Sequence, residues 1–588
     1  MKQFFKFVFA SMLGFMLAGF LLFFLLVGLL IGSLSSAFSK QEVFVVRPGT
    51  VLHLTLDQEI VDRGSDDRFA AFDPFSLQST QATGLNDLLG NITRAKDDPN
   101  ISGIFLDLGF LNTGWSTIDE LRQKLLDFKE SGKFIIAYGE VFNQAAYYLA
   151  TVADEVYVHP EGMIELVGLN SEIMFFKNTL DKLGIEAQII RHGQFKSAGE
   201  PFFLEKMSNE NREQIESFMG SIWGNVVADI AESRGIAPDD LIVLIDQFAA
   251  RNPPLAIKNG LIDGMLHRDE VLEKIKEKLG FEKASDIILA TLTNYKNSPS
   301  RGKPVREKIA IVYGTGVIIP GKGGESVMGS ATIAQALKEA RTDNMVKAIV
   351  FRINSPGGSA LASDVILREL ELARAAKPVV VSFGDVAASG GYYVACKADY
   401  IIANPNSITG SIGVFGVIPN MKSFFNQKLG ITFDNVKTNE LADFGSINRP
   451  LTSRERAIIQ EEVARIYNTF ITHVAKGREM SAIDVDKIGG GRVWSGAEAL
   501  EIGLVDELGG LELAIDVAAE KAKLENYRLV ELPVQRTFLQ RIIDDWGQTQ
   551  ERHLKSNLGQ AYHYLKKLEN VNQSVGILMR MPFDVKIE

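Results

Sequence analysis

The chain has 588 residues, of which 46% are hydrophobic and 23% are charged. This length suggests several domains or two large ones, and the composition excludes a collagen, a disordered tail protein and a disulfide-stapled mini-protein. The single cysteine, Cys396, excludes an intrachain disulfide and a multi-cysteine zinc site, and we expect it to pack in a core. A net charge of −11 argues against a general nucleic-acid binder.

The N-terminal segment is the most apolar part of the chain. Residues 7–31 carry no charge, and about 20 such residues are enough for a helix to span a bilayer. Lys2 and Lys6 precede the run, which places the N-terminus in the cytoplasm and the body on the periplasmic, extracytoplasmic side. A cleaved signal peptide is the alternative, but its apolar core usually has only about 7–15 residues. We therefore expect residues 1–40 to form an uncleaved, single-pass anchor in the inner membrane, with its helix at about 7–31.

The body contains an internal repeat. Shifted by 245 residues, the chain matches itself without gaps from about residue 85 to residue 168. The apolar runs 103–106 and 134–139 fall on 348–351 and 379–384, and each is typical of a buried parallel strand. Apolar residues at helical spacing lie between these strands in both copies. They are Leu88, Ile92 and Ala95 in the first copy and their counterparts Ile333, Leu337 and Ala340 in the second. This alternation predicts an α/β unit, a parallel sheet covered by helices, that occurs twice.

The repeat divides the chain into segments. The first copy covers residues 45–290, a polar connector covers 291–308, and the second copy covers 309–523. The remaining residues, 524–588, form a C-terminal tail. Its pattern predicts two helix faces (Leu539, Ile542 and Ile543; Tyr562, Leu565 and Leu568) and a closing strand at 575–579.

The two copies differ in the residues of the turns that follow their strands. Copy two has Ser389 between Ala388 and Gly390, at a turn that opens a helix, whereas copy one has Gln144 at this position. A serine in such a turn is either a helix N-cap or a nucleophile. A second turn, with Gly357 and Gly358, also follows a strand, and with Gly390 it offers backbone N–H groups for an oxyanion. The two turns together favour the nucleophile.

A serine nucleophile needs a base. None of the seven histidines lies in a small-residue turn beside a carboxylate motif. Copy one contains Lys196 in the stretch 191–202, and copy two has no lysine at the equivalent place in 437–444. A buried lysine can stay neutral and serve as a base. Copy one thus keeps a candidate base without a serine, and copy two keeps a serine without the base.

These motifs resemble a known family. The stretches 356–358, 388–391, 409–413 and 195–198 are together similar to the signal peptide peptidases of the protease IV family, in their long, duplicated, membrane-anchored bacterial form. The resemblance covers the chain from the anchor to about residue 523. It implies tandem Clp/crotonase-like domains, a Ser–Lys dyad and a homotetramer, without a cofactor or metal. Ser389 matches the nucleophile, Lys196 the general base and Ser411 the serine that orients the lysine, while Gly357, Gly358 and Gly390 match the oxyanion turns.

The resulting hypothesis is a membrane-anchored serine endopeptidase that degrades cleaved signal peptides and other hydrophobic peptides through an acyl-enzyme. A crotonase-like acyl-CoA enzyme and a non-catalytic membrane scaffold are the alternatives. The anchor argues against the first, because CoA is a cytoplasmic cofactor. The sequence leaves open the residue preference at the cleaved bond and whether the dyad forms within one chain or between neighbours.

Overall fold

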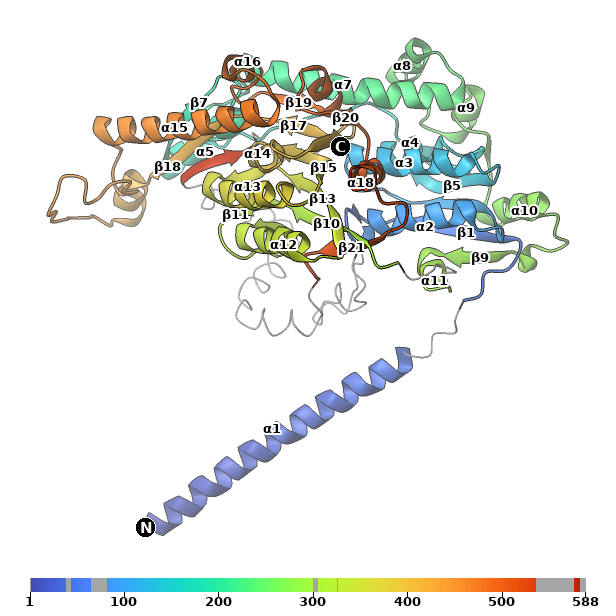
Figure 1. Cartoon of the computed structure of the whole chain (residues 1–588), viewed down its shortest axis with the longest axis horizontal. Coiled ribbons are helices and arrows are strands. Elements are labelled where there is room, and N and C mark those ends of the chain that lie inside the picture. The colour runs from blue at the N-terminus through green and yellow to red at the C-terminus, as the bar shows by residue number, and fades with distance from the viewer. Residues whose placement is uncertain are drawn as a thin grey trace.

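The computed structural model describes residues 2–38, 44–64, 82–299, 305–324, 326–535 and 576–581. Its first element is a single long helix, α1 (Lys2–Phe38), which includes the predicted range 7–31 and which Figure 1 draws apart from the α/β body. Within these described residues, no helix is both long and apolar enough to cross a membrane. Anchoring in a membrane stays a prediction.

The first copy forms a six-stranded parallel sheet. Its strands are consecutive apolar runs separated by helices, and such runs pair in parallel when both faces of the sheet are covered. The strand order is β8 (Gly264–Met265), β6 (Glu155–Ile164), β5 (Phe134–Phe142), β4 (Ile101–Leu108), β1 (Thr50–Leu56) and β9 (Ile288–Thr291).

The second copy forms an eight-stranded sheet of the same plan. Its main path is β19 (Val493–Ser495), β17 (Ile408–Gly410), β15 (Val379–Ala388), β13 (Val346–Ser355), β10 (Lys308–Thr315) and β21 (Arg528–Leu532). Off this path, β16 (Tyr400–Ala403) pairs with β15, and β20 (Glu507–Leu508) pairs with β16. β21 pairs with β10 as β9 pairs with β1, so the sheet of the second copy extends past residue 523 into the segment assigned to the tail.

A third sheet joins the two copies and the C-terminus. Its order is β12 (Val327–Gly329), β11 (Val317–Ile319), β14 (Gly357–Ser359), β22 (Gly576–Arg580), β18 (Val414–Asn420) and β7 (Glu186–His192). β7 belongs to the first copy and pairs antiparallel with β18 of the second. The predicted closing strand of the tail is thus present as β22, while both predicted helix faces of the tail lie outside the described residues. Two short strands, β2 (Ile60–Val61) and β3 (Thr83–Gly84), pair separately.

The helices cover both main sheets (Figure 1). In the first copy they are α2 (Leu85–Asp97), α3 (Trp115–Lys129), α4 (Gln144–Ala150), α5 (Lys177–Leu183), α6 (Glu200–Phe203), α7 (Asn209–Arg234), α8 (Pro238–Asp246), α9 (Pro253–Lys258) and α10 (Arg268–Leu279). The predicted connector contains α11 (Leu292–Lys296). In the second copy they are α12 (Ser330–Thr342), α13 (Ala360–Arg374), α14 (Gly390–Ala395), α15 (Ser453–Gly477), α16 (Ala482–Ile488), α17 (Gly496–Glu501) and α18 (Leu511–Lys521). The predicted apolar faces of α2 and α12 are buried in the core.

Side-chain contacts repeat between the copies as the sequence does. Tyr147 donates a hydrogen bond to the Leu261 carbonyl at 2.8 Å, and Tyr392 donates to the Leu504 carbonyl at the same distance. In each copy an aspartate also accepts a hydrogen bond from a backbone N–H near the start of a strand. Asp154 accepts from Ile135 N of β5 at 2.7 Å, and Asp399 accepts from Val379 N of β15 at 2.8 Å. Repeated tertiary contacts of this kind show that the chain contains one α/β unit twice.

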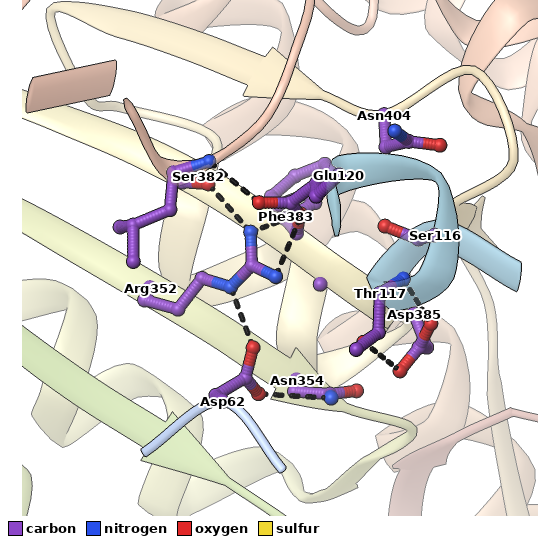
Figure 2. A network of polar contacts seen from close by, with 12 residues as sticks. Asp62, Ser116, Thr117, Glu120, Arg352, Asn354, Ser382, Phe383, Asp385 and Asn404 are labelled. Carbon is purple, nitrogen blue, oxygen red and sulfur yellow. Dashed lines mark hydrogen bonds and ion pairs between the residues drawn. The ribbon is translucent and has the colours of Figure 1, made fainter. Parts of the chain in front are cut away.

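The two units are joined by a buried polar network, which is centred on Arg352 of β13 (Figure 2). Its guanidinium donates to Asp62 at 2.8 Å and lies 2.7 Å from Glu120 of α3 as an ion pair outside hydrogen-bond alignment. Asp385, near the end of β15, accepts bonds from the backbone and hydroxyl of Thr117 at 2.9 and 2.7 Å. The network therefore couples α3 of the first unit to the two central strands of the second.

Candidate active site

Ser389 lies at the turn between β15 and α14. Its backbone has φ 55° and ψ −113°, a conformation that a non-glycine residue adopts only under strain. The backbone N–H donates to the Gly410 carbonyl at 2.8 Å, and the carbonyl accepts from Tyr393 N at 2.8 Å, so the turn is held from both sides. A sharp strand-to-helix turn of this type presents a serine hydroxyl away from the sheet.

Lys196 reaches this serine from the other copy. It follows β7, which leaves the first unit and pairs with β18 of the second. Its Nζ lies 2.9 Å from Ser389 Oγ, 3.0 Å from Ser411 Oγ and 3.1 Å from the Ser411 carbonyl oxygen. All three side chains are fully buried. The structure thus brings the three predicted polar residues together within one chain.

The surroundings of Lys196 favour its neutral form. Burial lowers its pKa well below 10.5, because the ammonium loses its hydration. Within the described residues, no carboxylate forms an ion pair with it. A neutral amine has a lone pair with which it can accept a proton, which an ammonium lacks.

The glycines of the two turns meet beside Ser389. Gly357 has φ 94°, which a glycine adopts without strain, and a methyl group there would lie only 2.6 Å from Gly390 N. A methyl group on Gly390 would lie 3.1 Å from Gly358 N. The backbone N–H groups of residues 358 and 390 therefore border one small space next to the serine. Such a pair of donors suits an oxyanion.

A buried hydrogen-bond network holds the loop that carries Lys196. Glu200 accepts bonds from Ser208 Oγ at 2.6 Å and from Asn211 Nδ2 at 3.1 Å. Gln214 donates to Ser197 Oγ at 2.8 Å, and its carbonyl oxygen accepts from Val493 N at 3.1 Å. The first turns of α7 thus fix the loop to β19 of the second unit.

Comparison with known proteins gives the family of this site. The sequence profile of peptidase family S49 matches residues 127–282 and 371–525, more than half of the chain and one segment in each copy. The chain belongs to peptidase family S49. It is 38% identical to Protease 4 of Haemophilus influenzae over 446 residues, which cover 74% of this chain and 72% of that protein.

Further relatives of this S49 chain are named for the same chemistry. It is 34% identical to the chloroplastic serine protease SPPA of Arabidopsis thaliana, over 85% of this chain and 74% of that protein. It is 36% identical to a putative signal peptide peptidase SppA of Enterococcus faecium, over 33% of this chain and 57% of that protein. The S49 chain is accordingly a serine peptidase of the protease IV type.

In the first copy of this S49 peptidase, a glutamine fills the place of the serine. The Gln144 amide oxygen accepts bonds from Val167 N at 2.9 Å and Gly168 N at 2.7 Å, and its Nε2 donates to the Gly168 carbonyl at 2.9 Å. The glutamine therefore occupies the turn with its own side chain, which matches the loss of the serine in the sequence.

The histidines and the cysteine, which could also act as a base or a nucleophile, form no part of the site around Ser389 in the described residues. No histidine among the described residues is hydrogen-bonded to Ser389; His53, for example, lies 3.0 Å from Asp107 in the first unit. Cys396 is buried among core side chains, as expected, and burial raises its thiol pKa to about 12.

The glycines that accommodate Lys196 were not predicted from the sequence. Gly491 has φ 89°, and a methyl group there would lie 2.5 Å from Lys196 N and 2.6 Å from its Cα. The Gly490 carbonyl accepts a bond from Phe195 N at 3.1 Å. Three consecutive glycines, at residues 489–491, are the sequence signal that marks this close approach of two backbones.

Proposed function

We propose that this S49 peptidase is an endopeptidase with a Ser389–Lys196 dyad, and that it degrades cleaved signal peptides and similar apolar segments. The observation that carries the proposal is the 2.9 Å distance between Ser389 Oγ and Lys196 Nζ in a fully buried setting. The name of the Enterococcus faecium relative supports the substrate class.

The mechanism follows from the geometry. Neutral Lys196 removes the proton from Ser389, and Oγ attacks the scissile carbonyl carbon. The N–H groups at residues 358 and 390 stabilise the negative charge that develops on the carbonyl oxygen. Lys196 then gives its proton to the leaving amine as the C–N bond breaks. A water molecule repeats the sequence on the acyl-enzyme and releases the acid. Ser411 keeps the amine directed at Ser389.

The test compares two catalytic variants with two matched controls. Ser389→Ala and Lys196→Ala should each lower the rate of cleavage of a synthetic signal peptide by about 10³-fold or more. Ser423→Ala and Lys206→Ala change exposed residues and should leave the rate unchanged. A serine-reactive phosphonate probe should label the parent chain at Ser389. Cleavage at the parent rate by either catalytic variant would show that the dyad is assigned wrongly.

We further propose that α1 anchors the enzyme in the inner membrane, with its N-terminus in the cytoplasm and its catalytic body outside. The uncharged residues 7–31 and the preceding lysines support this orientation. Retention of the chain in the membrane fraction after an alkaline wash tests it. The resemblance to the protease IV family also supports Clp/crotonase-like domains and a homotetramer, for which the mass of the detergent-solubilised enzyme is the measurement.

The alternatives have less support. Membership in family S49 places the chain among peptidases, and it gives no support to an acyl-CoA enzyme or to a scaffold without activity.

A further inference from the structure

Gln214 of α7 is fully buried between the loop that carries Lys196 and the second unit. Its Nε2 lies 3.2 Å from the Phe195 carbonyl oxygen and 2.8 Å from Ser197 Oγ, so it holds the residues on both sides of Lys196. Its Oε1 accepts a hydrogen bond from Val493 N at 3.1 Å. One side chain thus connects the loop of the base to β19, on which α7 packs (Figure 1).

The same strand fixes the second partner of the lysine amine. β19 pairs antiparallel with β17, which ends one residue before Ser411. The Arg492 carbonyl accepts a hydrogen bond from Ser411 N at 2.6 Å and so holds Ser411, whose φ is 50°. Ser411 in turn contacts Lys196 Nζ through its hydroxyl and its carbonyl oxygen. Gln214 therefore ties the lysine loop to the strand that positions the orienting serine.

The charged side chains near this loop are paired with one another. Arg191 lies 3.5 Å from Glu200, and Arg492 lies 3.0 Å from Glu213. Arg191 also donates to the Lys196 carbonyl at 3.3 Å, so it contacts the backbone of the lysine and not its amine. In the described part of the chain, no charged side chain is hydrogen-bonded to Nζ. The direction of the amine therefore depends on the hydrogen bonds that hold the backbone of the loop.

The second copy shows that the equivalent helix folds without this glutamine. α7 begins after Ser208 and α15 begins after Thr452, and each of these hydroxyls accepts a hydrogen bond from the N–H three residues later. When the two helices are aligned on these caps, Ile458 of α15 is the counterpart of Gln214. The copy without the lysine thus has an isoleucine at this position. The glutamine accompanies the lysine, as expected for a residue that serves it.

From these contacts we infer that Gln214 is a positioning residue for the dyad. It fixes the loop of the first unit on β19 of the second, and thereby keeps Lys196 Nζ at 2.9 Å from Ser389 Oγ and away from water. The inference rests on the proposed function and adds the residue that aligns its base. When the loop is released, the amine is directed less well at the serine and becomes hydrated. Hydration stabilises the ammonium, so a smaller fraction of the enzyme holds a lysine that can accept a proton.

Two variants test this role. Gln214→Met has a side chain of similar size without the amide, and we expect kcat for a synthetic signal peptide to fall by about 10-fold or more with KM nearly unchanged, since a displacement of about 1 Å in a catalytic group can cost about 10²-fold. The low-pH limb of kcat/KM, which reports deprotonation of the base, should move to higher pH. Ser197→Ala removes one bond from the side of the loop and keeps the glutamine. It should move the limb in the same direction by a smaller amount, and it carries the test if Gln214→Met does not fold.

Gln188→Met is the matched control. Gln188 is also a buried glutamine of the first unit; it lies on β7, and its Oε1 accepts a hydrogen bond from Leu451 N of the second unit at 2.9 Å. This bond joins the two units as well, but it involves no residue next to Lys196. The control should lose stability, measured as the thermal midpoint, without a change in kcat or in the pH profile. A shift of the limb in Gln188→Met as well, or parent values of kcat and of the limb in Gln214→Met, would overturn the inference.

Labelling of Ser389 by a phosphonate probe separates this inference from the proposed function, because it needs an activated serine but no peptide. Gln214→Met should be labelled more slowly than the parent chain, with the same shift of the rate to higher pH. If Lys196→Ala is labelled and cleaves peptide as the parent chain does, the dyad itself is assigned wrongly. If Lys196→Ala loses both reactions while Gln214→Met is labelled at the parent rate at every pH, the dyad is correct and the positioning role of Gln214 is wrong.

Discussion

Lys196 is the residue whose ordinary chemistry is changed most by the fold. A lysine on a protein surface is charged at neutral pH, but burial lowers the pKa of Lys196 well below 10.5. Its three polar contacts are two hydroxyls and one carbonyl, none of which carries a charge to stabilise an ammonium. The neutral amine that the chemistry needs is thus a result of packing, and it has a cost in stability that can be measured.

The sign of this cost follows from linkage. The unfolded chain holds the Lys196 proton up to about pH 10.5, and the folded chain releases it at lower pH, so rising pH stabilises the folded state. Lys196→Met removes the titrating group. At pH 6–7 we expect this variant to be more stable than the parent chain by on the order of 1 kcal/mol, while it is inactive. The difference should shrink as the pH approaches 10.5.

Thermal midpoints at several pH values measure this effect. Lys206→Met, at an exposed lysine, is the control and should show no such trend with pH. A stability difference between Lys196→Met and the parent chain that does not change with pH would mean that Lys196 stays charged in the folded state.

At the scale of elements, the repeat made much of the fold predictable. Apolar runs at a fixed offset located the strands β4, β5, β13 and β15, and the disagreement between Gln144 and Ser389 located the site. The sequence could not reveal that β7 crosses to β18, or that β22 lies beside β14, because these antiparallel pairings join distant segments without a shared periodicity. Gly491 was missed for a similar reason, since its neighbour Lys196 is almost 300 residues away in the chain.

The contact between Gly491 and the Lys196 loop gives a prediction at this scale. Gly491→Ala would place a methyl group within 2.6 Å of the backbone of Lys196, so the loop must move. A displacement of about 1 Å in a catalytic group can cost about 10²-fold in rate. We expect a fall in kcat of about 10- to 100-fold in assays of peptide cleavage.

The neighbouring glycine supplies the control. Gly490 also has a positive φ, 60°, but the nearest atom to a methyl group there is 3.9 Å away. Gly490→Ala should therefore share the backbone strain without the loss of activity. If both variants lose activity equally, the close approach of residue 491 to the lysine is not the cause.

For the molecule as a whole, the dyad requires that two units keep a fixed relative position, because each contributes one member. Arg352 links them through two acids, Asp62 and Glu120, in a buried setting (Figure 2). Burial opposes the charge of the guanidinium, but the attraction of Glu120 and Asp62 outweighs it, so the pKa of Arg352 is raised. The same network reaches Asp385, four residues before Ser389, so the junction and the site share strand β15.

Removal of the arginine should therefore weaken the whole molecule. Arg352→Met leaves two buried acids without their partner, and loss of one member of a buried ion pair costs about 3–5 kcal/mol. Burial raises the pKa of Glu120 to about 7 against the pull of Arg352, and loss of that pull raises it further. Because the folded state then binds a proton that the unfolded state releases above about pH 4.5, the variant should lose stability as the pH rises, and its deficit should be larger at pH 9 than at pH 6.

Arg368→Met removes an arginine whose side chain is 68% exposed, and should cost less than about 1 kcal/mol at either pH. Thermal midpoints of the two variants at both pH values measure these losses of stability. If the losses are equal in the two variants and do not change with pH, the buried network does not hold the units together.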